Sequence, residues 1–156
     1  MIPLLTSAYR LLISIGNSLQ SPFLLIIRLY WGWQFFLTGK GKLMNFEKTT
    51  EFFSGLNIPL PAFNAALAGS TEMVGGLLLL VGLASRLTAI PLIITMVVAY
   101  LTADWDAAKM ISSEPDKFFA AAPFLHLFAC VLVLIFGPGK FSIDYLLSKK
   151  YAPEKS

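Results

Sequence analysis

The chain has 156 residues, of which 56% are hydrophobic and 13% are charged, whereas a soluble domain carries about 25% charged residues. So little charge cannot cover a globular surface in water, and a single cysteine, Cys130, excludes a disulfide-stapled secreted domain. The composition predicts one small integral membrane domain. We attribute its net charge of +3 to basic flanks beside anionic lipid headgroups, not to a nucleic-acid-binding surface.

Residues 1–20 are apolar but are interrupted by polar side chains such as Arg10 and Asn17. They are too short and too polar for a membrane span, and they lack the cleavage site of a signal peptide. We expect an amphipathic helix that lies on the membrane surface, followed by a new helix with Ser21 as its N-cap and Pro22 at its first position.

Four stretches are long and apolar enough to cross a bilayer. They cover 21–38, 62–84, 87–103 and 118–137, and no stretch alternates as a strand does. The prediction is an all-α membrane protein, a four-transmembrane-helix bundle with an N-terminal interfacial amphipathic helix. Residues 21–147 form the membrane domain and 148–156 a basic cytoplasmic tail.

The connections between the spans carry further expectations. Segment 39–61 is long and aromatic, so we expect a short helix from Asn45 to Gly55 and a cap that rests on the bundle. A helical turn is expected near 106–110. Four spans place both termini on one side, which carries slightly more Lys and Arg, so the positive-inside rule favours cytoplasmic termini.

Three ionisable residues lie inside the predicted spans: Arg28, Glu72 and His126. A charge at the centre of a spanning helix costs about 2.5–3.5 kcal/mol on insertion scales, so each needs a partner or a function. Counting 1.5 Å per residue places Gln34, Glu72 and His126 near one level, close to the midplane. Arg28 lies a turn or two nearer the termini.

These residues define a predicted polar centre for ligand binding, to which Trp31 and Thr95 are added from the first and third spans. Small residues on the second span allow a neighbouring helix to approach its carboxylate closely. The predicted helix-packing set is Ala65, Gly69, Gly75 and Gly76.

The residues alone leave several interpretations of this polar centre open. Arg28 and Glu72 could form a structural ion pair that fixes helix packing, with His126 hydrogen-bonded in the core. The centre could instead bind a small lipophilic ligand, such as a quinone or a lipid headgroup. It could also belong to a proton or ion pathway in a transporter component.

No catalytic residue and no metal site is predicted. His126 and Cys130 share one helix face, but two ligands alone do not make a metal or haem site. The run from Gly39 to Lys42 lacks the spacing of a phosphate-binding loop, and we expect it to be a flexible basic exit from the first span.

Several segments, in their order and spacing, make the chain similar to a known family. They are Arg28–Gly32 with Phe36, Gly39–Leu43, Ile58–Pro61, Glu72–Leu83, Ser85–Arg86 and Gly137–Asp144. Over about residues 24–147 the chain resembles the DoxX family of small four-helix bacterial membrane proteins.

The resemblance implies a bundle in the bacterial inner membrane with Arg28 and Glu72 as signature polar residues. It also implies a link to redox chemistry, because the family is named after a subunit of an archaeal thiosulfate:quinone oxidoreductase and some relatives assemble with redox-protective enzymes. Many relatives carry an acidic residue early in the last span, where this chain has Ala120 to Pro123.

We therefore expect a multi-pass inner-membrane protein without self-contained catalysis, which binds a quinone or lipid as an accessory subunit linked to redox or sulfur metabolism. A quinone is the candidate cofactor. If the protein takes part in catalysis, we expect it to do so as a subunit of a quinone-linked oxidoreductase. Candidate partners are the lipid bilayer, a redox protein and a second copy of the chain. A structural or assembly subunit and a transporter component are the alternatives.

Overall fold

A computed structural model describes the backbone of residues 2–151 and the side chains of residues 6–151. This part of the chain contains α1 (Ile2–Met44), α2 (Phe46–Gly55), α3 (Pro61–Val81), α4 (Ser85–Thr102), α5 (Trp105–Lys109), α6 (Pro115–Ala120), α7 (Ala122–Phe136) and α8 (Ile143–Tyr151). No strand occurs among the described residues. Helices α1, α3 and α4 are long and apolar enough to cross a membrane, and α7 is a shorter apolar helix. The prediction of an all-α membrane bundle is confirmed.

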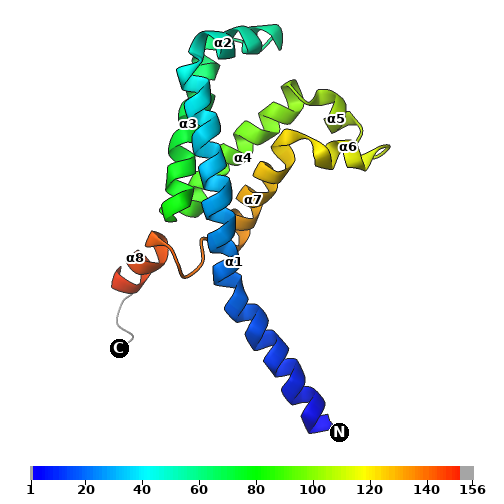
Figure 1. The fold of residues 1–156 in the computed structure, drawn as a ribbon, viewed down its shortest axis with the longest axis vertical. Coiled ribbons are helices and arrows are strands. Elements are labelled where there is room, and N and C mark those ends of the chain that lie inside the picture. Colours follow the sequence, from blue (N-terminus) through cyan, green and yellow to red (C-terminus); the bar gives the residue numbers. More distant parts are fainter. Residues whose placement is uncertain (1, 152–156) are drawn as a thin grey trace.

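The first helix differs from the prediction, because α1 runs without a break from residue 2 through the first span. Pro22 lies inside α1, so Ser21 is not the N-cap of a new helix. A proline removes only its own N–H donor, and the residues on both sides remain helical. Figure 1 shows the N-terminal part of α1 extending away from the bundle. That this part lies on a membrane surface remains a prediction.

The other end of α1 also differs from the prediction. Gly39 to Lys42 is not a flexible exit, because α1 stays helical as far as Met44. Short helix α2 then follows Asn45 and ends at Gly55, as expected. The Asn45 side chain does not cap α2, since its amide donates a hydrogen bond back to the Gly41 carbonyl, at 3.0 Å.

The predicted fourth span is divided into two helices. Ala121 has an extended backbone, with ψ near 141°, and separates α6 from α7. Pro123 lies in the first turn of α7, where its missing N–H is tolerated. Helix α7 has 15 residues, which corresponds to about 22 Å, whereas the hydrocarbon core of a bilayer is about 30 Å thick. Of the predicted tail, residues 148–151 belong to α8 and 152–156 lie outside the described residues.

Helices α1 and α3 form the most extensive contact in the bundle and lie antiparallel (Figure 1). Gly32 and Gly39 of α1 face Gly76 and Gly69 of α3. A Cβ atom on Gly76 would lie 2.5 Å from the carbonyl oxygen of Gly32. The two backbones therefore touch directly, which only glycine at these positions permits.

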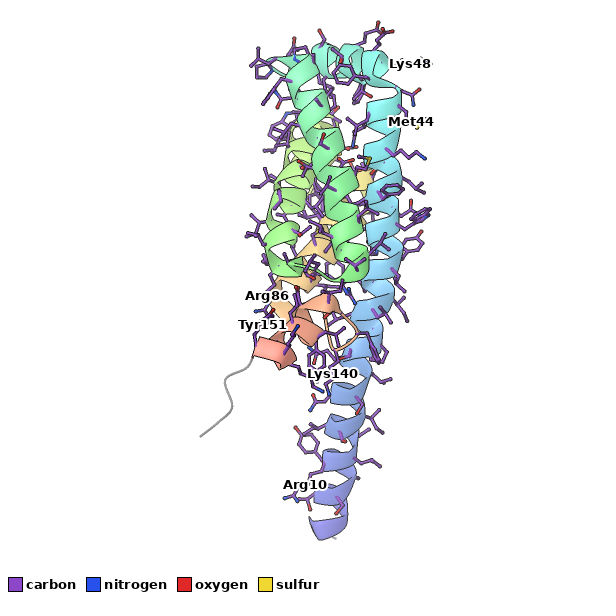
Figure 2. All side chains as sticks on the ribbon, turned by 90° about the vertical axis from the view of Figure 1, so that its left-hand side faces the viewer. Arg10, Met44, Lys48, Arg86, Lys140 and Tyr151 are labelled. Carbon is purple, nitrogen blue, oxygen red and sulfur yellow. The ribbon has the colours of Figure 1, made fainter. Side chains whose placement is uncertain are left out.

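The buried core lies between α1, α3, α4 and α7 and consists of Phe35, Leu79, Ala89, Leu92, Met96, Cys130 and Val133. The outward surfaces of these helices are also apolar, with exposed side chains such as Ile26, Leu77 and Ile90. A large exposed apolar surface on spanning helices is the part that contacts the lipid bilayer. Figure 2 shows Arg86 and Lys140 toward one end of the bundle and Met44 and Lys48 at the other.

Candidate functional site

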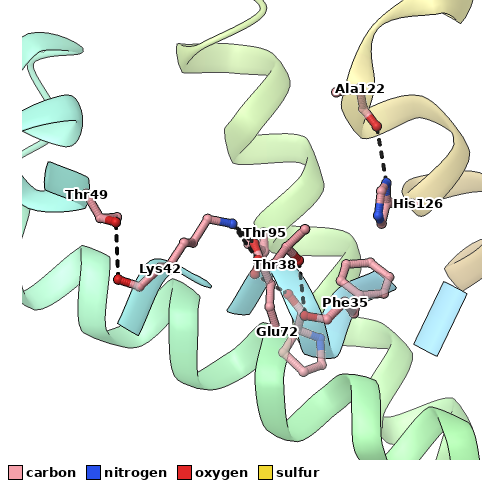
Figure 3. Close-up of polar contacts among 9 residues, drawn as sticks. Phe35, Thr38, Lys42, Thr49, Glu72, Thr95, Ala122 and His126 are labelled. Carbon is pink, nitrogen blue, oxygen red and sulfur yellow. Dashed lines mark hydrogen bonds and ion pairs between the residues drawn. The ribbon is translucent and has the colours of Figure 1, made fainter. Parts of the chain in front are cut away.

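Glu72 is the buried carboxylate of α3, and only 1% of its surface is exposed. Its partner is Lys42, in the last turn of α1, whose ammonium contacts both carboxylate oxygens and lies 2.6 Å from Oε1. The Lys42 side chain is 30% exposed. A long lysine stem can cross apolar surface in this way while its charged head meets a partner. Figure 3 shows the side chain of Lys42 reaching the carboxylate of Glu72.

The ion pair between Arg28 and Glu72 that the sequence suggests does not form. Arg28 is 1% exposed and donates hydrogen bonds to the carbonyl oxygens of Leu79 at 3.2 Å, Leu80 at 3.4 Å and Phe141 at 2.5 Å. The last carbonyls of a helix lack intrahelical partners and carry partial negative charge, which suits a guanidinium group. Arg28 therefore joins the end of α3 to the segment before α8.

The alignment of α1 with α3 explains why these two residues stay apart. Gly32 is level with Gly76, and in an antiparallel pair a step back along α1 matches a step forward along α3. Arg28 is consequently level with Leu80, as its hydrogen bond shows. Glu72 lies eight residues before Leu80, which is about 12 Å along the helix axis.

A cavity of about 530 Å³ between α1, α2, α3, α4 and α7 includes the ion pair, and we call it the central cavity. Small-molecule sites usually have volumes of about 300–1,000 Å³ and mainly apolar walls. Most of the lining residues here are apolar: Phe52, Phe53, Leu56, Ile58, Leu67, Ala68, Pro91, Ile94, Met96, Val98, Ala99, Ala103, Ala122 and Pro123. The polar ones are Thr38, Lys42, Asn64, Thr71, Glu72, Thr95, Thr102, Asp104 and His126.

The expected cap over the bundle contributes to this cavity. Phe52 and Phe53 of α2, with Leu56 and Ile58 just after it, line the cavity. Helix α2 also contacts α3 more extensively than it contacts α1. The aromatic connection between α1 and α3 therefore forms part of the cavity wall.

Two hydroxyl groups face the central cavity next to the ion pair. Thr38 donates its hydroxyl proton to the Phe35 carbonyl at 3.0 Å, and Thr95 donates to the Pro91 carbonyl at 2.9 Å. Each hydroxyl oxygen keeps lone pairs that can accept a hydrogen bond from a ligand. Both threonines therefore add acceptors to a region where Lys42 supplies the donors.

His126 comes to the cavity from α7 (Figure 3). Its Nδ1 lies 3.2 Å from the Ala122 carbonyl oxygen, and its ring packs edge-on against Trp31 and Phe35, with centroid distances of 4.7 and 4.9 Å. Its Nε2 is buried and has no hydrogen-bond partner among the described residues. An unpaired buried nitrogen costs about 1–3 kcal/mol, so a polar ligand atom at this position would be stabilising.

The structure brings together part of the predicted ligand-binding set. Glu72, Thr95 and His126 line the central cavity. Trp31 does not line it, but its ring packs against the ring of His126. Arg28 and the half-buried Gln34 are not part of its lining. Among the described residues, no group of three or more His, Cys, Asp or Glu side chains is placed to hold a metal ion.

The residues of the predicted helix-packing set, Ala65, Gly69, Gly75 and Gly76, are all buried. Gly69 and Gly76 face α1, where Cβ atoms would meet Leu43 and the backbone of Gly32. Gly75 faces the other way, because its Cβ would lie 3.0 Å from the side chain of Leu92 on α4. Helix α3 therefore contacts α1 through Gly69 and Gly76 and contacts α4 through Gly75.

Lys42 is a central residue of this site that is not among the residues predicted from the sequence. The apolar stretch of the first span ends at Thr38, so Lys42 is taken as part of a connection outside the membrane. The seven-residue glycine spacing shared by α1 and α3 is the signal that could have identified it. One of the alignments that this spacing allows brings Lys42 within reach of Glu72.

Known proteins match this chain at the level of sequence. The DoxX family model matches residues 23–105, a range that contains Arg28, Lys42 and Glu72. A Bacillus subtilis (strain 168) protein named "Putative oxidoreductase CatD" is 34% identical over 92 residues, which are 59% of this chain and 67% of that protein. The "Uncharacterized membrane protein Rv3486" of Mycobacterium tuberculosis is 33% identical over 141 residues and 83% of each chain. No solved structure matches the chain.

Proposed function

Because the chain belongs to the DoxX family of membrane proteins, we propose that it binds a quinone in its central cavity and acts as an accessory subunit of a redox system in the bacterial inner membrane. One observation carries the proposal. The cavity of about 530 Å³ combines mainly apolar walls with a buried ion pair and an unpaired imidazole nitrogen. A quinone has the complementary chemistry, with two polar oxygens on an apolar ring and an apolar tail.

Lys42 and His126 supply the polar contacts that a quinone or quinol head needs. The Lys42 ammonium has three donors and directs two toward the Glu72 oxygens, which leaves one for a quinone carbonyl. When His126 donates from Nδ1 to the Ala122 carbonyl, its neutral ring presents Nε2 as an acceptor. That acceptor suits the hydroxyl group of a quinol, so the residues of this cavity match both oxidation states.

The redox assignment is supported by the name of one relative. The Bacillus subtilis protein is named "Putative oxidoreductase CatD", and its similarity to this chain covers 92 residues. We propose the role of a subunit that holds quinone for a partner enzyme, with sulfur compounds as one class of reductant for that partner. We also propose cytoplasmic termini, from the excess of basic residues on that side.

The test is quinone retention by the full chain in lipid nanodiscs loaded with menaquinone or ubiquinone, measured by native mass spectrometry. Ala68 lines the central cavity, so Ala68→Phe fills it. Ala62 lies on the same helix, is exposed and is not part of the lining, so Ala62→Phe is the matched control. We expect quinone retention to be lost in A68F and kept in A62F.

Two results would contradict the proposal. Equal quinone retention by A68F and the unsubstituted chain would show that the cavity does not hold the quinone. Retention of phospholipid in place of quinone, lost on A68F, would replace the quinone by a lipid as the ligand of this cavity.

A further inference from the structure

A second cavity, of about 510 Å³, lies at the opposite end of the bundle from the central cavity. We call it the terminal groove, and its polar lining residues include Ser21, Ser85, Arg86, Lys140, Asp144 and Ser148. Helix α3 ends, α4 begins and α7 ends at this level. The groove therefore lies where the hydrocarbon core meets the headgroup region, and Figure 2 shows Arg86 and Lys140 at this end of the bundle.

Two cations face the terminal groove. Arg86 is exposed and donates one hydrogen bond to the Ile135 carbonyl at 3.1 Å, which holds its guanidinium group beside Gly137. A guanidinium group has five N–H donors, so this contact uses a small part of its capacity. Lys140 is exposed, and its backbone N–H donates to the Ser21 hydroxyl at 3.2 Å.

Among the residues that the structure describes, one acid lines the groove, Asp144, and it is already engaged. Its carboxylate accepts hydrogen bonds from the backbone N–H groups of Ala84 at 2.6 Å and Ser85 at 2.8 Å, at the start of α4. The buried charge of Arg28 also acts on it. Asp144 therefore stabilises the helix end, and the charge available to a ligand in the groove is positive.

Ser85 gives an independent indication of a polar ligand. The residue is fully buried, at 0% exposure, and it lines the groove. Its hydroxyl oxygen has no hydrogen-bond partner among the described residues. Buried hydroxyl groups are almost always paired, and leaving one unpaired costs free energy.

We propose that the terminal groove binds the phosphate-bearing headgroup of an anionic phospholipid. The phosphate oxygens accept hydrogen bonds from Arg86 and Lys140, a pairing in which arginine can donate two bonds at once. Leu24, Leu87 and Phe136 also line the groove and meet the first part of the acyl chains. Basic pockets between spanning helices at the membrane border recognise anionic lipids by the same chemistry.

The experiment measures lipid selectivity of the full chain in nanodiscs that contain equal amounts of phosphatidylglycerol and phosphatidylcholine. Native mass spectrometry of the released protein reports which lipid it keeps. We expect a preference for phosphatidylglycerol that falls about 5-fold in Lys140→Gln and about 30-fold in the double variant R86Q/K140Q. The control double variant K40Q/K48Q removes two exposed cations at the other end of the bundle and keeps the preference.

Several outcomes would overturn this proposal. One is equal retention of both lipids by the unsubstituted chain, and another is an unchanged preference in K140Q. K140Q alters only an exposed side chain, so it keeps the test valid even where R86Q/K140Q does not fold. Binding of inorganic phosphate by the chain in detergent, without any lipid preference in nanodiscs, would assign the groove to free phosphate. Quinone retention stays unchanged in K140Q, which separates this groove from the central cavity.

Discussion

Replacing Lys42 by methionine tests whether the Lys42 ammonium stabilises the buried carboxylate of Glu72 inside the bundle. Methionine keeps most of the length and the apolar contacts of the side chain and removes the charge. Glu72, which is 1% exposed, then faces the central cavity without its cation. Removing one partner of a buried ion pair costs about 3–5 kcal/mol, because the remaining charge is left uncompensated.

The partial exposure of Lys42 sets the expected size of this loss. The Lys42 side chain is 30% exposed, so water screens part of the pair and the lower end of the range applies. We expect a loss of about 3 kcal/mol in the free energy of unfolding at pH 7.

The assay is unfolding in mixed micelles by titration with sodium dodecyl sulfate, followed by circular dichroism. The double variant K42M/E72Q should recover most of the lost stability, because no uncompensated charge remains in it. Lys40→Met is the control, since Lys40 is an exposed neighbour on the same helix. The reasoning is refuted if K42M unfolds like the unsubstituted chain, or if adding E72Q to K42M restores nothing.

The other predictions concern helix packing. Gly76→Leu should lower the free energy of unfolding by at least about 1–3 kcal/mol, because a Cβ would meet α1 backbone at 2.5 Å. Gly41→Ala, which meets open space, should raise it by about 0.5–1 kcal/mol in the same titration, and the reverse order would contradict the α1–α3 contact. Arg28→Met should make the segment 137–142 more susceptible to limited proteolysis, because the Phe141 carbonyl loses its donor, and unchanged cleavage would argue against that attachment. Cys130 is fully buried, so maleimide should label it only after unfolding, and rapid labelling of the folded chain would contradict the packing of α7.

Hydropathy locates the spans of this chain but not the ends of its helices. The apolar stretch ends at Thr38, yet α1 continues to Met44. Two of these last residues, Gly39 and Gly41, disfavour helix, so packing of α1 against α3 at Gly39 outweighs intrinsic propensity here. Two prolines with similar local sequences also differ in effect. Pro22 lies within α1, whereas Pro123 stands in the first turn of α7 after the break at Ala121. The packing around each proline decides the outcome, and single-sequence signals do not contain it.

The polar residues could be selected from the sequence, but their partners could not. Depth counting places Glu72 and His126 near one level, and both line the central cavity. Arg28 is as easily recognised in the sequence as a charged residue within a span, yet its partners are backbone carbonyls. Every residue has a backbone carbonyl, so the sequence does not indicate which of them Arg28 contacts. Which side chains meet depends on how two helices are aligned, and no single helix specifies that.

The glycines that join α1 to α3 have a consequence for how these helices find each other. Each helix carries two of them seven residues apart: Gly32 and Gly39 on α1, and Gly69 and Gly76 on α3. A slip of seven residues would again bring one glycine of each helix face to face, so close backbone approach alone admits more than one alignment. In a slipped pair, Lys42 would be displaced by about 10 Å from Glu72, and the carboxylate would stand without a cation among apolar side chains. The glycines thus determine how closely α1 and α3 approach each other, and the pairing of Lys42 with Glu72 determines how the two helices are aligned along their axes.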